Sequence, residues 1–315
     1  MPLAAKRNPA TRGSGRPGSL ERHFAMRACA FCAAAAIVVS AAGAAFAEDV
    51  VAESVEEAEP EATGRKWLSF HAFADIETAY VSRGYIWDTR PYSAQYADTV
   101  LDLDKFGRAE ASIWTYSPMS SSGTSASMSR YAYAEIDYLL RYYYDIEIAD
   151  GWRLQNGVGR QWVTNPGFHG GHTLMDWQAL QVLHNPWLTP YWRLRVIRKP
   201  IRELFWVVGV KRAFSLMDDL TLTLDLSSDI GDNRHYVNLY GPRDGVPGAR
   251  YHGVFKDFTF VARLDYALVE HVDLFAFVGQ FCLLSSEARD AVKAADGPEM
   301  RRDLTFGGVG VALAF

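Results

Sequence analysis

The sequence predicts an all-β fold, namely a transmembrane antiparallel up-and-down β-barrel of twelve strands. Three observations predict it. Segments that alternate apolar and polar residues recur along the chain, tight connections alternate with longer polar ones, and the last segment is a period-2 strand that ends on Phe315. No Pro- or Ser-rich linker divides this region, which favours one large barrel over two small domains.

Residues 1–47 are predicted to be a signal peptide. Arg22 and Arg27 precede an apolar run over 28–39, and Ala45-Phe46-Ala47 supplies the small-x-small cleavage pattern. A start at Met26 would leave a signal of ordinary length. No later apolar run approaches the ~20 residues that a membrane-spanning helix needs, so we expect an exported protein without such helices.

Residues 48–66 form an acidic tail that we expect to be disordered. Seven acidic residues lie within 48–61, and a segment this charged cannot bury apolar surface. The chain after residue 47 carries a net charge of −10 and no basic stripe, so we expect no nucleic-acid partner. Cys282 is the one cysteine left after the signal, which excludes an internal disulfide framework, and we expect no cofactor.

The barrel is expected over 67–315. Its strands are predicted at 71–85, 93–104, 106–117, 130–145, 152–163, 174–184, 189–198, 203–213, 219–228, 257–268, 271–283 and 303–315. The fourth and ninth segments alternate most clearly, with Ile136 and Tyr138 set against Glu135 and Asp137 in the fourth. The fifth and sixth alternate poorly.

The connections between these segments are sorted by length. Tight turns are expected at 104–106, 148–151, 185–187, 216–218 and 269–271, and longer loops at 117–129, 165–172, 228–256 and 285–302, with 199–202 as a short exception. Short periplasmic turns and longer external loops are typical of outer-membrane barrels, whereas a soluble β-sandwich has no reason to sort its loops this way. The predicted location is therefore the bacterial outer membrane, reached through the periplasm.

The last segment has two different faces. Leu313, Val311 and Val309 lie on one side, while small residues and Phe306 lie on the other. Such a strand resembles the closing strand of outer-membrane barrels, whose terminal aromatic residue is read by the barrel-assembly machinery. The predicted assembly signal consists of Phe306, Val309, Val311, Leu313 and Phe315.

A membrane environment explains why the strands must close and why aromatic residues lie near the strand ends. A strand edge cannot be satisfied in hydrocarbon, so the sheet must close, and its outer face must meet lipid and lipopolysaccharide. Aromatic residues near strand ends are expected to form interfacial girdles: Trp87, Trp114, Tyr116, Trp152, Trp162, Trp187 and Trp206. A soluble sandwich core could also hold such residues and is the alternative.

Charges of both signs fall on the predicted polar faces. The candidate lumen-lining residues are Asp75, Glu77, Arg83, Glu135, Asp137, Arg141, Arg193, Arg195, Lys211, Asp225, Arg263 and Asp265. They could select ions, with Arg193 and Arg195 setting the preference, or they could form a salt-bridge network that plugs the barrel. Twelve strands lie between the filled eight-stranded barrel and the open sixteen-stranded one, so the sequence leaves both readings open.

Several short motifs resemble one family. The segments Ala79-Tyr80-Val81-Ser82-Arg83-Gly84-Tyr85, Pro91-Tyr92-Ser93-Ala94-Gln95 and Leu101-Asp102-Leu103 are similar to the opening of the TorF-type outer-membrane porin family of small Gram-negative barrels. Further matches are Glu135-Ile136-Asp137-Tyr138, Leu188-Thr189-Pro190-Tyr191-Trp192 and the closing strand. The resemblance implies a small barrel that acts as a passive channel.

Catalytic and metal sites cannot be assembled from the sequence. None of the histidines is followed two positions later by Ser, as in outer-membrane phospholipases, and His271-x-Asp273 lies in a predicted periplasmic turn. His169 and His172 offer only two metal ligands, so we expect no metal and no enzyme. The predicted function is passive diffusion of small polar solutes or ions. The alternative is a structural or adhesive barrel with a plugged lumen, which binds through loops 228–256 and 285–302.

Overall fold

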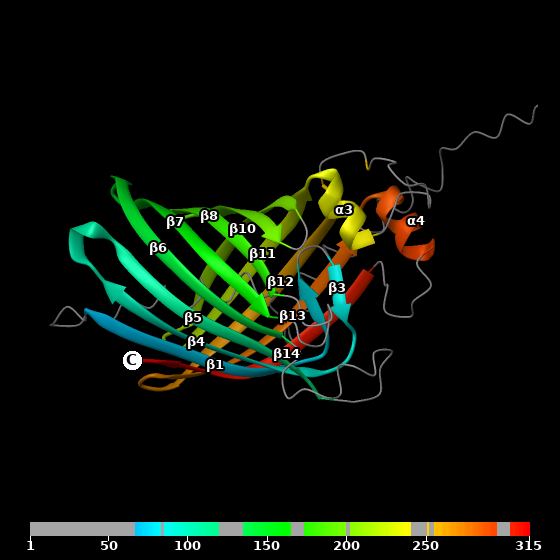
Figure 1. The fold of residues 1–315 in the computed structure, drawn as a ribbon. Helices are drawn as coiled ribbons and strands as arrows, with labels where there is room; N and C mark the ends of the chain where they lie inside the picture. The colour runs from blue at the N-terminus through cyan, green and yellow to red at the C-terminus, as the bar shows by residue number, and fades with distance from the viewer. Residues whose placement is uncertain are drawn as a thin grey trace, which may run out of the picture. The chain divides into compact units, whose positions relative to one another are not determined.

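The computed structural model describes residues 67–82, 85–119, 135–164, 173–199, 202–240, 251, 255–294 and 303–315. These residues form a closed antiparallel barrel of twelve strands, in which each strand pairs with its neighbour in the barrel and β1 pairs with both β4 and β14 (Figure 1). The predicted fold class is confirmed. The predicted signal peptide and acidic tail lie outside the described residues.

The barrel strands follow the chain in order. They are β1 (Leu68–Glu77), β4 (Tyr92–Asp102), β5 (Arg108–Pro118), β6 (Glu135–Ala149), β7 (Trp152–Thr164), β8 (Thr173–His184), β9 (Thr189–Lys199), β10 (Glu203–Met217), β11 (Leu220–Gly231), β12 (Asp257–Val269), β13 (Val272–Leu283) and β14 (Asp303–Ala314). The remaining elements are a short hairpin, β2 (Tyr80–Ser82) and β3 (Tyr85–Asp88), a 3₁₀ turn over Asp104–Phe106, and helices α3 (Asn233–Tyr240) and α4 (Ser286–Ala294).

The two ends of the barrel differ in their connections. At the end that we call the turn end, strands are joined through 103–107, 150–151, 185–188, 218–219 and 270–271, close to the predicted turns. In one of these turns the Asn185 carboxamide oxygen accepts hydrogen bonds from the backbone N–H groups of Trp187 and Leu188 (3.0 and 3.1 Å). The opposite end, the loop end, carries α3 and α4, and the C-terminus lies away from it (Figure 1).

Burial alternates along the strands because one face of each looks into the barrel. In β6, Glu135, Asp137 and Leu139 are buried, while Tyr138 and Leu140 are about half exposed at 48% and 52%. The outward positions of other strands are likewise apolar, as in β11, where Leu226 is exposed. The barrel therefore has an apolar outer face and an inner face that carries its buried charged and polar residues.

The contact between β13 and β14 explains the small face of the last strand. On the inner side, Phe275 and Phe277 of β13 lie over Gly310 and Gly308 of β14. A Cβ at Gly310 would lie 2.4 Å from the Phe275 ring, and one at Gly308 would lie 2.6 Å from the Phe277 ring. The alternation predicted for this strand is thus a packing requirement, since only glycine accepts these rings.

The first predicted strand, 71–85, is wrong in its second half. β1 ends at Glu77, and the chain then forms the separate β2–β3 hairpin before β4 begins at Tyr92. Glu77 and Tyr92 are direct cross-strand partners, so the whole of 78–91 is an insertion between two paired positions. The side chains of Ala79, Tyr80, Val81 and Ile86 are instead buried in a cluster at the loop end of the barrel.

Two helices lie in segments that were predicted only as long loops. β11 continues to Gly231 and is followed by α3, whose residues contact β10 and β11, and α4 follows β13 and contacts α3. None of the described helices is long and apolar enough to cross a membrane.

Candidate functional site

The candidate site is the polar inner face of the barrel. Ten of the predicted lumen residues have buried side chains there: Asp75, Glu77, Glu135, Asp137, Arg141, Arg193, Arg195, Lys211, Asp225 and Arg263. Asp265 lies on the same face and is partly exposed, and Arg83 lies outside the described residues. Burial to this degree means that side chains, and not bulk water, surround most of these charges.

One buried network centres on Arg195, whose side chain is fully shielded from solvent. Its guanidinium donates to the Asp176 carboxylate (Nε to Oδ2, 2.7 Å) and to the Gln161 carboxamide oxygen (2.5 Å). Gln161 in turn donates to Asp137 (2.5 Å), and Gln178 donates to both Gln161 and Asp176. These hydrogen bonds join four strands, β6 to β9, across the inner face. The ion pair with Asp176 compensates the buried charge of Arg195.

A second network centres on Glu110 of β5. Its carboxylate accepts hydrogen bonds from the Tyr143 hydroxyl (2.7 Å), the Ser112 hydroxyl (2.9 Å) and the Tyr96 hydroxyl (3.3 Å). Arg141 lies 3.7 Å from the same carboxylate and donates to the Tyr143 oxygen (3.0 Å). Each of these partners lies on β4, β5 or β6, so the network stiffens this wall of the barrel.

The remaining wall carries smaller contacts. Tyr191 reaches across Gly209 and donates to Asp225 (2.9 Å), and a Cβ at Gly209 would lie 2.4 Å from its ring. Arg263 forms an ion pair with Asp265 (2.6 Å), and its guanidinium lies 4.0 Å from the centre of the Phe275 ring. These contacts hold long side chains flat against the wall, where they narrow the lumen less than if they projected into it.

Two carboxylates on β1 stand apart from the ion pairs. Asp75 and Glu77 occupy successive inward positions, and both are 4% exposed. Asp75 Oδ1 and Glu77 Oε2 have no hydrogen-bond partner among the described residues. Arg193 and Arg195 lie on β9 and Lys211 lies on β10, so acidic and basic side chains are not evenly spread over the inner face.

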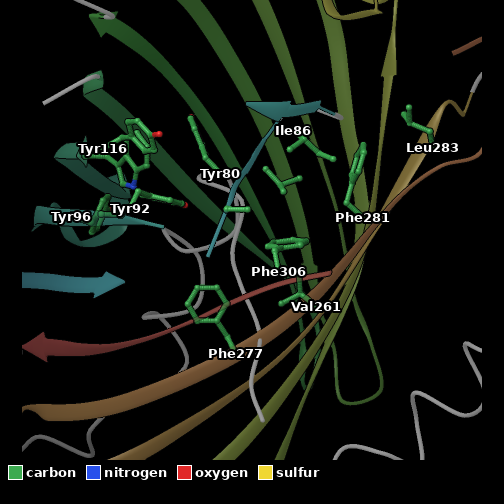
Figure 2. Close-up of a cluster of buried hydrophobic side chains, with 14 of the residues drawn as sticks. Tyr80, Ile86, Tyr92, Tyr96, Tyr116, Val261, Phe277, Phe281, Leu283 and Phe306 are labelled. Carbon is green, nitrogen blue, oxygen red and sulfur yellow. The ribbon is translucent and has the colours of Figure 1, made fainter. Parts of the chain in front are cut away.

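The β2–β3 hairpin fills the loop end of the lumen. Tyr80 stacks on Tyr116 with ring centres 5.0 Å apart and lies 5.6 Å from Trp114 and 5.7 Å from Tyr92 (Figure 2). On β3, Asp88 accepts a hydrogen bond from the Tyr116 hydroxyl (2.5 Å) and pairs with Arg90 (2.5 Å). The hairpin is therefore held against β5 by aromatic stacking and by the hydrogen bond from Tyr116, while the ion pair with Arg90 lies within the inserted segment.

The hairpin joins a cluster that extends across the barrel interior. The buried members in contact include Ile86 of the hairpin, Val261 of β12, Phe281 and Leu283 of β13, and Phe306 of β14 (Figure 2). Trp114 and Tyr116 belong to this cluster, so their predicted place in an interfacial girdle is wrong. Both residues lie near the end of a strand, as predicted. However, they occupy strand positions whose side chains point into the barrel, so they lie in the lumen.

Helix α3 anchors at the loop end through His235. The imidazole is buried and stacks on Phe205 of β10 with ring centres 4.5 Å apart, and Nδ1 lies 3.2 Å from Glu203. Arg195 lies on the Phe205 ring as well, 5.6 Å from its centre, so the helix and the lumen network share one aromatic residue. Burial raises the pKa of Tyr236 to about 12, and its oxygen accepts a hydrogen bond from the Gly231 N–H (2.7 Å).

A buried lysine links the two helices. Lys256 is fully shielded and lies 3.6 Å from Glu287 of α4, while Tyr236 and Tyr251 cover its ammonium at 5.3 and 5.7 Å from their ring centres. Cation–π contacts of this kind stabilise a desolvated ammonium. Lys256 thus joins α3 and α4 through one ion pair and two aromatic contacts.

The turn end is more open. A cavity of about 500 Å³ lies there, lined by charged and aromatic residues of the turn 103–107 and of strands β5 to β7. Within it, Asp145 pairs with Arg108 (3.1 Å) and Arg153 (3.6 Å), which are each about a quarter exposed. Among the described residues, this cavity therefore lies at the turn end, whereas the β2–β3 hairpin and its aromatic cluster occupy the loop end.

The sequence analysis did not identify the uncharged glutamine residues of the network around Arg195. Gln161 and Gln178 carry most of the contacts around Arg195, and both lie in the two segments that alternated poorly. The available signal was parity: Gln161 is two positions from Val163 and two from Gly159, on the face that the ladder of β7 turns inward. No group of three or more potential metal ligands lies among the described residues, and His169 and His172 are outside them.

The fold and this inner face define a class: closed transmembrane-type barrels with a charged interior. No family model and no curated protein matches the chain. Among solved structures, it is similar to an outer membrane channel from Pseudomonas putida F1 (TM-score 0.46, 11% identity, 82% of this chain and 100% of that one). It is also similar to a KdgM porin in complex with disordered oligogalacturonate (TM-score 0.44, 10% identity, 78% and 99%).

A third similarity is to outer membrane phospholipase A from Escherichia coli (TM-score 0.43, 12% identity, 78% of this chain and 92% of that one). By their names, the first of these structures is a channel, the second is a porin and the third is an enzyme.

Proposed function

We propose that the chain is a porin-like barrel of the bacterial outer membrane, which lets small polar solutes or ions pass passively through a narrow charged lumen. The observation that carries the proposal is the inverted polarity of the barrel: apolar side chains outside, charges of both signs inside. Such a barrel satisfies every strand edge in lipid and keeps its charges away from hydrocarbon.

The orientation follows from the two ends. If the short connections of the turn end lie in the periplasm, then the loop end, with α3, α4 and the β2–β3 hairpin, lies on the extracellular side. This agrees with the rule that the longer loops of outer-membrane barrels are external. Export through the periplasm, the signal peptide 1–47 and assembly by the barrel-assembly machinery are parts of the same proposal. The resemblance to the TorF-type porin family supports it through short motifs in β4, β6, β9 and β14 and in the hairpin.

The lumen must be narrow in this conformation. The β2–β3 hairpin and the aromatic cluster occupy its loop end, whereas a cavity of about 500 Å³ opens at the turn end. Passage of a solute therefore requires either a thin water path beside the hairpin or displacement of the hairpin. Either route would admit ions and small polar molecules.

The test is single-channel conductance in a planar bilayer, with protein produced from the complete sequence and checked for a heat-modifiable gel shift. We expect discrete conductance steps with a defined reversal potential. A barrel that folds by the gel-shift criterion and stays silent at all voltages would overturn the channel proposal.

A second candidate is a structural or adhesive barrel with a plugged lumen. The observation that favours it is the complete burial of Arg195 and Tyr116, two inward side chains that are fully covered by their neighbours. In that case binding would occur at the segments 228–256 and 285–302, which include α3 and α4. Lost cell-surface binding on removal of α4, in a barrel without conductance, would support it.

A further inference from the structure

One charged side chain interrupts the apolar outer face of β7. Gln161 and Val163 are buried inside the barrel, so Arg160 and Trp162 point to the outside. The Arg160 guanidinium lies between two outward indoles, 4.9 Å from the ring centre of Trp162 and 5.1 Å from that of Trp177 on β8. Arg160 and Trp177 are direct cross-strand partners, so this arrangement is set by the register of the sheet.

No carboxylate compensates this charge among the described residues. The hydrogen-bond acceptor of the Arg160 guanidinium is the Met175 sulfur, and Nε is buried without a partner. A thioether is a weak acceptor, and a guanidinium on a lipid-facing surface is unfavourable unless an anion or water meets it. The geometry therefore calls for an anionic acceptor from beyond the described residues.

A second arginine lies nearby on the same surface. Arg198 is exposed on β9, one position before Lys199, which pairs with Met175 in the β8–β9 ladder. The described residues place no carboxylate within ion-pair distance of Arg198 either. Both arginines lie toward the loop end of their strands, at the level where tryptophan is favoured at a membrane interface.

We propose that Arg160, Arg198 and the two indoles of Trp162 and Trp177 bind a phosphate-bearing lipid of the outer leaflet, namely the phosphorylated glycolipid of lipopolysaccharide. A guanidinium fork matches phosphate oxygens, and two arginines match a lipid that carries two phosphates. The indoles and the apolar belt below them contact its acyl chains. The inference rests on the proposed outer-membrane location, with the loop end outward, but not on conduction.

Lipid retention by the detergent-purified full chain tests the site. Native mass spectrometry would compare diphosphoryl lipid A with lipid A from which the phosphates have been removed, with inorganic phosphate as a competitor. Wild-type protein should retain the diphosphoryl form preferentially, and the Arg160→Gln/Arg198→Gln variant should bind it about tenfold more weakly, as expected for lost charge-assisted hydrogen bonds.

The matched control is Arg212→Gln. Arg212 also points outward, but it lies toward the turn end, where it donates to the Pro186 carbonyl and lies over Phe214. Its replacement should leave lipid retention unchanged. Arg160→Lys, which keeps the charge and loses the fork, should fall between wild type and the double variant and covers the case in which glutamine impairs folding.

Three results would overturn the site. They are equal retention by the double variant and wild type, equal retention of lipid A with and without phosphates, and complete displacement by inorganic phosphate, which would indicate a free-anion site. A silent bilayer recording combined with phosphate-dependent lipid retention would remove the channel proposal and leave the lipid site standing.

Discussion

Arg195 shows how a charge can be buried inside this barrel. Its guanidinium is shared between Asp176 and Gln161, and the Phe205 ring covers it. Burying such a pair contributes little net stability, but removing one partner leaves an uncompensated charge, which costs about 3–5 kcal/mol. The lumen charges are thus structural members of the wall as well as candidates for ion selection.

The selectivity hypothesis concerns Arg193 and Arg195. Replacing both by glutamate places negative charge on the basic side of the lumen, and we expect the reversal potential under a salt gradient to move toward cation preference. Planar-bilayer recordings measure this shift.

The Arg193→Gln/Arg195→Gln variant serves as the control for folding, since it removes the charges without adding carboxylates beside Asp176. A correctly folded reversal variant with an unchanged reversal potential would contradict the hypothesis.

Gly310 provides a stability prediction. A Cβ there would lie 2.4 Å from the Phe275 ring and 2.7 Å from the Ala74 carbonyl oxygen, so Gly310→Val must displace both a ring and a backbone. Overpacking of this kind costs about 1–3 kcal/mol or more. The midpoint of the heat-modifiable gel shift should fall.

Val309→Leu is the matched substitution one position earlier. Val309 is on the outer face and 60% exposed, so the larger side chain should leave the midpoint unchanged. Equal midpoints for the two variants would show that the packing of β13 on β14 is looser than the distances indicate.

At the scale of elements, the β2–β3 hairpin occupies the lumen at the loop end. It is inserted between Glu77 and Tyr92, which already face each other in the barrel ladder. Its contacts are to the inner face, through Tyr80 on Tyr116 and Asp88 with the Tyr116 hydroxyl. The barrel is therefore complete without the hairpin, whose only described packing is within the lumen.

Replacing 78–91 by the dipeptide Asn-Gly should open the lumen. The two residues form the tight hairpin turn that paired strand ends accept, so β1 and β4 should keep their register. We expect a retained gel shift and a clearly larger single-channel conductance.

A comparison variant, Asp88→Asn, should have a smaller effect because it weakens the ion pair with Arg90 and leaves the aromatic stack in place. Unchanged conductance in the dipeptide variant would place the constriction elsewhere, at the networks around Arg195 and Glu110.

For the whole molecule, closure depends on the pairing of the first and last strands. β1 and β14 pair along their length, and Phe70 and Phe315 exchange backbone hydrogen bonds of 3.0 and 2.9 Å beside that ladder. The Phe315 ring also stacks on His271, with ring centres 5.2 Å apart. Phe315 thus stabilises the pairing of β1 with β14, in addition to its proposed role as an assembly signal.

Deleting Phe315 should lower the amount of assembled barrel in cells. The loss removes the backbone hydrogen bonds with Phe70 and the aromatic residue that we expect the assembly machinery to read. The measurement is the heat-modifiable fraction in outer-membrane extracts.

Phe315→Tyr keeps the ring and the backbone and should assemble as wild type does. Full assembly of the deletion variant would contradict the proposed signal formed with Phe306, Val309, Val311 and Leu313.

The sequence by itself determined the fold class, the tight turns and the inward parity of residues such as Glu135 and Asp137. These follow from local rules, because side chains alternate at every position of a strand and short connections leave no other path. The closing strand could be predicted for the same reason, because large apolar and small residues alternate along it.

The tertiary structure alone decided which charges meet and what fills the lumen. The predicted strand 71–85 continues past Glu77 in the sequence, and the pairing of Glu77 with Tyr92 excludes the β2–β3 hairpin from the wall. The contacts of Arg195 with Gln161, and of Arg160 with Trp177, join residues of different strands. Register and closure bring such residues together, and both arise from the sum of all strand pairings, which no local pattern in the sequence encodes.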